Sequence, residues 1–110
     1  MNALKYEYFV TKTFGSERGA DPARVGDANY YNNVNDKNYL NKVRIGLAYT
    51  ISRKSSELIN TKQVRDPDDY VALDNLIDRA LNVKNSQHID AVIDDAQKLF
   101  DELEKLPNRW

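Results

Sequence analysis

Residues 87–107, QHIDAVIDDAQKLFDELEKLP, carry a near-continuous apolar seam at helical spacing. The seam is formed by Ile89, Val92, Ile93, Ala96, Leu99, Phe100, Leu103 and Leu106. Residues that recur every three or four positions lie on one face of an α-helix, and proline does not continue a helix. The pattern therefore predicts an amphipathic helix over about 87–106 that needs other helices to cover its apolar face.

The segment before this seam contains a well-defined helix start, Asp66-Pro67-Asp68-Asp69. Asp66 is suited to the N-cap, Pro67 to the first helical position, and the next two carboxylates to the positive end of the helix dipole. A second helix is expected over about 67–82. Its apolar face would comprise Tyr70, Leu73, Leu76, Ile77, Ala80 and Leu81. Either Asn85 or Ser86 could then cap the helix that follows.

A third amphipathic pattern covers about 37–59. Its stripe consists of Leu40, Val43, Leu47, Ala48, Ile51, Ser55, Leu58 and Ile59. Arg44 falls within the stripe at 100° per residue, so we expect it to need a partner there. On the opposite side Lys42, Ile45, Tyr49 and Arg53 line up and combine cations with exposed apolar surface.

Residues 1–35 differ from the helical part of the chain. The stretch 5–14 is rich in aromatic and β-branched residues, and residues 15–28 contain three of the four glycines together with Pro22. We therefore predict a mainly α fold, with a three-helix bundle over 36–110 and an extended N-terminal arm over 1–35 that could form a short β-ribbon. An isolated two-stranded ribbon is marginal in water, so the arm needs the helices or a partner.

Composition places the chain among small globular proteins. With 110 residues it is expected to be one domain, and 41% hydrophobic and 30% charged residues suit a folded chain. The absence of cysteine excludes disulfides and thiolate metal sites and suits a cytoplasmic protein or an assembled particle. The apolar runs are too short to span a bilayer, and the N-terminus lacks the apolar stretch of a secretory signal.

The net charge of −1 conceals an asymmetry along the chain. Residues 36–65 contain seven basic and two acidic residues, whereas residues 66–110 contain five basic and eleven acidic residues. Such asymmetry points to polyanion binding or charge-steered association. It also suits a basic helix that packs beside two acidic helices, and this second interpretation stays open.

Catalytic motifs are not recognisable, and we expect no enzymatic activity, cofactor or bound metal. The single histidine, His88, lacks a second histidine, serine or cysteine nearby, so a surface or capping role is expected. Asp74 with Asp78 and Asp90 with Asp94 are i, i+4 carboxylate pairs, which makes a Mg²⁺-dependent phosphohydrolase a remote alternative. A solvated acidic face explains these aspartates more simply.

The leading hypothesis is a non-enzymatic protein-binding or assembly module that has a protein partner or a second copy of itself. Its contacts would come from the arm and the outer face of the first helix, through Tyr6, Tyr8, Phe9, Phe14, Lys42, Ile45, Tyr49 and Arg53. The arm aromatics could instead cover this chain's own bundle. A small accessory or virion protein of a mobile element would fit this size and lack of catalytic chemistry.

Nucleic-acid binding is the alternative function. It would use Lys42, Arg44, Arg53, Lys54 and Lys62, with neighbouring tyrosines available for stacking. The cations are spread around the helix, and the isoelectric point of about 5.8 is unlike that of a dedicated nucleic-acid binder.

Overall fold

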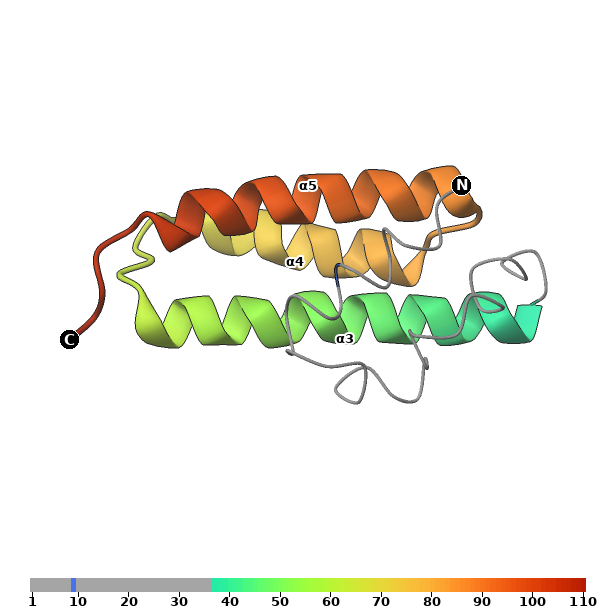
Figure 1. The fold of residues 1–110 in the computed structure, drawn as a ribbon, viewed down its shortest axis with the longest axis horizontal. Coiled ribbons are helices and arrows are strands. Elements are labelled where there is room, and N and C mark those ends of the chain that lie inside the picture. Colours follow the sequence, from blue (N-terminus) through green and yellow to red (C-terminus); the bar gives the residue numbers. More distant parts are fainter. Residues whose placement is uncertain (1–8, 10–36) are drawn as a thin grey trace.

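The computed structural model describes Phe9 and residues 37–110. The described chain forms three helices: α3 (Lys37–Thr61), α4 (Pro67–Leu81) and α5 (Ser86–Glu104). Consecutive helices run in opposite directions along the long axis of the molecule (Figure 1). The predicted three-helix bundle is confirmed, and the helix ends lie within two residues of the predicted ones.

Each of the shorter helices begins with the cap that its sequence predicts. The Asp66 side chain accepts a hydrogen bond of 2.9 Å from the backbone N–H of Asp68, and Pro67 begins α4. The Asn85 side chain accepts one of 2.9 Å from the backbone N–H of His88. Both caps satisfy donors that have no partner within their helix, which determines where α4 and α5 begin.

The three apolar stripes meet in one core, but Tyr70 and Leu81, which were predicted on the apolar face of α4, are 39% and 47% exposed. The largest fully buried side chains of the core include Phe100, Leu47, Ile51, Leu58 and Ile89, each no more than 2% exposed. Small residues, Ala80 from α4 and Ala96 from α5, are fully buried among them. Burial of this apolar surface is the main favourable term that holds the helices together.

Two hydroxyl groups lie inside this core without breaking it. Thr50 donates to the carbonyl oxygen of Gly46 at 2.7 Å, and Ser55 donates to that of Ile51 at 2.6 Å. A hydroxyl that bonds to the carbonyl one turn back avoids the cost of burying an unsatisfied polar group. Ser55 can therefore belong to the apolar stripe of α3, as predicted.

After α5 ends, the C-terminal tail runs beside the α3–α4 connection (Figure 1). Lys62 and Asn108 form an antiparallel β-bridge. The Gln63 N–H donates to the Pro107 carbonyl at 2.8 Å, and the Arg109 N–H donates to the Thr61 carbonyl at 2.9 Å. These bonds fasten residues 107–109 to one end of the bundle.

Phe9 belongs to the same core, although it is distant in sequence. Its side chain is 1% exposed, and its ring is stacked on Phe100 with centroids 6.2 Å apart and an interplanar angle of 1°. Its backbone is helical. The rest of the predicted arm and its β-ribbon lie outside the described residues.

Candidate functional site

The outer face of α3 carries the predicted partner-binding residues Lys42, Ile45, Tyr49 and Arg53, and all four are exposed. Ile45 is 51% exposed and Tyr49 is 44% exposed, on a helix whose opposite stripe is buried. Lys42, Tyr49 and Arg53 also interact within the chain. Of the two apolar side chains on this face, Ile45 is the more exposed.

The aromatic residues of the predicted site separate into two groups. Tyr6, Tyr8 and Phe14 lie outside the described residues. Phe9 lies in the hydrophobic core against Phe100 rather than on an exposed surface. In this arrangement Phe9 stabilises its own bundle, which is the second interpretation of the arm aromatics, and we do not include it in the candidate surface.

Arg44 has the partner that its position requires. Its Nε donates to the backbone carbonyl of Val83 at 2.8 Å, and its Nη1 donates to Oδ1 of Asn41 at 3.1 Å. Val83 lies in the connection between α4 and α5 and is 2% exposed. The half-buried guanidinium thus ties α3 to that connection.

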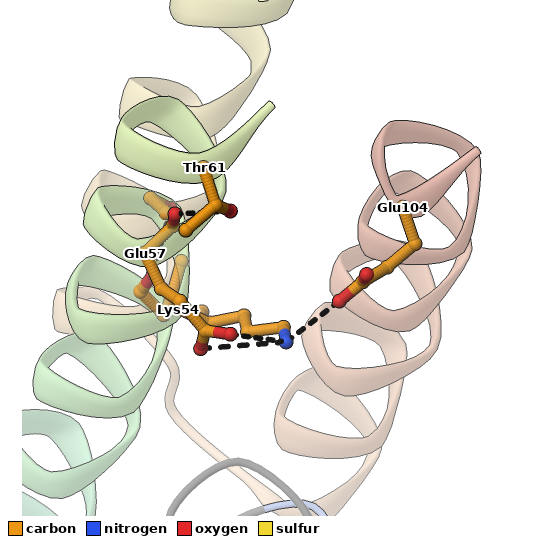
Figure 2. A network of polar contacts seen from close by, with 6 residues as sticks. Lys54, Glu57, Thr61 and Glu104 are labelled. Atoms are coloured by element: carbon orange, nitrogen blue, oxygen red, sulfur yellow. Dashed lines mark hydrogen bonds and ion pairs between the residues drawn. The ribbon is translucent and has the colours of Figure 1, made fainter. Parts of the chain in front are cut away.

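Lys54 is also engaged within the bundle, as Figure 2 shows. Its ammonium lies 2.8 Å from a carboxylate oxygen of Glu104 on α5 and 3.5 Å from one of Glu57 on its own helix. Partial burial lowers the pKa of Lys54, but the hydrogen bonds and negative charges of Glu104 and Glu57 outweigh it and raise the pKa above 10.5. This contact agrees with the interpretation in which a basic helix packs beside acidic helices.

Replacing Lys54 with glutamine should lower the free energy of unfolding at neutral pH, by at most about 1 kcal/mol because both carboxylates are well exposed. A raised folded-state pKa means that the stabilisation is fully present below the ordinary value of 10.5 and is lost as pH rises through the folded value. Urea denaturation in low salt and in high salt checks this, since the difference should shrink with salt. An equal loss in high salt would indicate lost packing of the lysine stem instead.

The remaining cation of the nucleic-acid set, Lys62, lies at the far end of α3 beside the C-terminal tail. Its ammonium donates to Oδ1 of Asn108 at 2.7 Å. The five predicted cations therefore do not form one continuous stripe: Arg44 and Lys54 are turned into the bundle, and Lys62 lies against the tail. This arrangement gives the nucleic-acid alternative little support.

The aspartates of the remote phosphohydrolase alternative do not assemble into a site. Asp74, Asp78 and Asp94 are exposed and Asp90 is half-buried. Within the described part of the chain, no three histidine, cysteine, aspartate or glutamate side chains are close enough together to hold a metal ion. These carboxylates therefore offer no support for a two-helix magnesium centre.

His88 takes part in the start of α5. Its Nδ1 accepts a hydrogen bond of 3.3 Å from the backbone N–H of Lys84, and its own backbone N–H is bonded to Asn85. The imidazole is exposed and helps to close the α4–α5 connection. This geometry is that of a helix cap.

One further cluster of side chains was not predicted from the sequence. Lys62, Gln63, Val64, Arg65, Tyr70 and Arg109 line a hollow of about 250 Å³ where the tail meets the α3–α4 connection. Five of its members come from residues 62–70 and the sixth, Arg109, from the C-terminal tail, and no periodicity or motif links the two groups. In the sequence, only the two basic residues just before α4, Lys62 and Arg65, pointed to this cluster.

A larger hollow, of about 440 Å³, lies between α4 and α5. Leu76 and Leu99 contribute apolar surface to it, and Arg79 and Asp95 form an ion pair of 2.8 Å among its lining residues. Charges of both signs line it, so its electrostatics select no ligand class.

Comparisons with protein-family models, with curated proteins and with solved structures find no match. Among the described residues, no helix combines the length and apolar character needed to cross a lipid bilayer.

Proposed function

We propose that this chain is a non-enzymatic protein-binding or assembly module that binds a protein partner through the outer face of α3. The observation that supports this most directly is the exposure of Ile45, 51%, on a helix whose opposite face forms the core. A single exposed isoleucine is ordinary on a protein surface. Here it lies one helical turn from the half-exposed ring of Tyr49, which gives an apolar centre of the kind found in interface cores.

Charge defines the kind of partner that fits this surface. Lys42 precedes Ile45 by three residues and Arg53 follows Tyr49 by four, so cations flank the apolar centre at both ends. A partner with an apolar patch bordered by carboxylates would be complementary. The acidic outer surfaces of α4 and α5 make a second copy of this chain the first partner to test.

Replacing Ile45 with aspartate should abolish most of the binding, with the dissociation constant rising at least about tenfold, because a carboxylate would be buried in the apolar centre. Trp110→Asp is the matched control, since Trp110 is 90% exposed and lies outside the three helices. Both variants should keep the helical circular dichroism and the melting transition of the natural protein. Self-association is measured by size-exclusion chromatography with light scattering over a range of concentrations.

Affinity capture with the three proteins extends the test to other partners. The proposal predicts self-association, or a captured protein, that the natural chain and Trp110→Asp show and Ile45→Asp loses. If every association is unaffected by Ile45→Asp, or is lost equally with Trp110→Asp, the α3 surface is not the binding face.

The nucleic-acid alternative makes a different prediction. It requires steep salt-dependent retention on heparin, whereas the proposed protein-binding surface does not. Because Arg44 and Lys54 are held by groups of the bundle, we rank this alternative second.

A further inference from the structure

The hollow where the C-terminal tail meets the α3–α4 connection has the chemistry of an anion site. Three of its lining side chains, Lys62, Arg65 and Arg109, are cationic, and no carboxylate is among the lining residues. Gln63 and Tyr70 add polar groups to the wall. A concave, polar wall with three positive charges favours a negatively charged ligand, because the cations attract it and the concavity lets several donors reach it together.

Hydrogen bonds between the tail and the end of α3 hold two of these cations in place. The Lys62 ammonium donates to the side-chain oxygen of Asn108 at 2.7 Å, and Gln63 Nε2 donates to the backbone carbonyl oxygen of Asn108 at 2.9 Å. Arg109 Nη1 donates to the Ile59 carbonyl at 3.0 Å. A lysine ammonium has three N–H donors and an arginine guanidinium has five. These hydrogen bonds therefore position Lys62 and Arg109 and use only some of their donors.

Two side chains next to the connection are held by hydrogen bonds of their own. The Tyr70 hydroxyl donates to the Val64 carbonyl at 2.8 Å, which fixes the ring beside the connection. The closest carboxylate in sequence, that of Asp66, accepts the Asp68 N–H as the cap of α4.

We propose that this hollow binds a phosphate group, either as the free ion or as the phosphate of a small ester. Phosphate has several acceptor oxygens arranged tetrahedrally, and arginine matches pairs of them with its planar set of donors. Lys62 supplies a compact charge between the two arginines. This site is separate from the α3 surface and does not depend on the proposed protein binding.

Trp110, the chain's single tryptophan, provides a direct readout. Its ring centroid lies 6.0 Å from the Arg109 guanidinium carbon. Titration with inorganic phosphate at constant ionic strength should give a saturable change in tryptophan fluorescence. Chloride at the same ionic strength should give none.

Arg65→Gln should weaken phosphate binding about tenfold, the effect expected for one charge-assisted contact. Lys84→Gln is the matched control, because it removes one positive charge at the α4–α5 connection, the opposite end of the bundle (Figure 1). Both residues are exposed, so both variants should fold. Ile45→Asp should also bind phosphate normally, which separates this test from that of the protein-binding surface.

Calorimetry with adenosine monophosphate and adenosine distinguishes the two sources of phosphate. Tighter binding of the nucleotide than of inorganic phosphate would assign a phosphate ester, and equal binding would assign the free ion. The proposal is overturned if neither phosphate compound gives saturable binding, if adenosine binds as well as its monophosphate, or if Arg65→Gln and Lys84→Gln behave alike.

Discussion

Replacing Phe100 with alanine should lower the free energy of unfolding by about 3–5 kcal/mol, the largest effect we expect from one substitution. Phe100 is 2% exposed and its ring stacks on Phe9, so truncation removes buried apolar surface and leaves a cavity beside the Phe9 ring. Urea denaturation followed by circular dichroism measures the loss. Val71→Ala, on an exposed valine, should change stability by no more than about 0.5 kcal/mol.

A double-mutant cycle with Phe9→Ala tests the stacked pair itself. Two stacked aromatic rings should show a coupling energy of about 0.5–1.5 kcal/mol beyond their separate burial. If Phe9→Ala has no effect on stability and the coupling is zero, Phe9 is not part of the core in solution and returns to the candidate partner-binding residues.

Replacing Arg44 with leucine should lower the free energy of unfolding by about 1–3 kcal/mol, which is the second largest effect we expect. Leucine keeps an apolar stem but leaves the Val83 carbonyl without its donor, and Val83 lies in a buried part of the α4–α5 connection. Lysine at this position should recover part of the loss only, because it lacks the planar guanidinium that reaches both Val83 and Asn41.

Arg79→Leu serves as the control for Arg44. Arg79 forms an exposed ion pair with Asp95, and such pairs contribute at most about 1 kcal/mol. Chemical denaturation of both variants gives the comparison. Equal losses would mean that Arg44 acts as an ordinary surface charge, and the cation would then be available to the nucleic-acid alternative.

Local patterns predicted the helices well because their causes are local. The apolar seam of α5 and the Asp66-Pro67 start of α4 depend on residues within one or two turns of each other, and these determine a helix and its beginning. The same reasoning found Arg44 in the stripe of α3 and required a partner for it. It did not identify that partner, because Val83 is 39 residues further along the chain.

The candidate sites were predictable to different degrees. Ile45 and Tyr49 could be assigned to an outer face from helical spacing, and both are exposed. The cationic hollow could not be predicted, because Lys62 and Arg109 meet only through the bridge between the tail and the α3–α4 connection. No spacing rule connects residues separated by so much intervening chain.

The sequence of this chain by itself determined three amphipathic helices, the caps of two of them and a basic helix followed by two acidic ones. Helical periodicity and capping are short-range effects, so they can be read from neighbouring residues. Only the tertiary structure decided that Phe9 stacks on Phe100, that Lys54 pairs with Glu104, and that the tail closes a cationic hollow. These contacts arise when packing brings distant segments together, since burial of apolar surface is non-directional and does not specify in advance which side chains will meet.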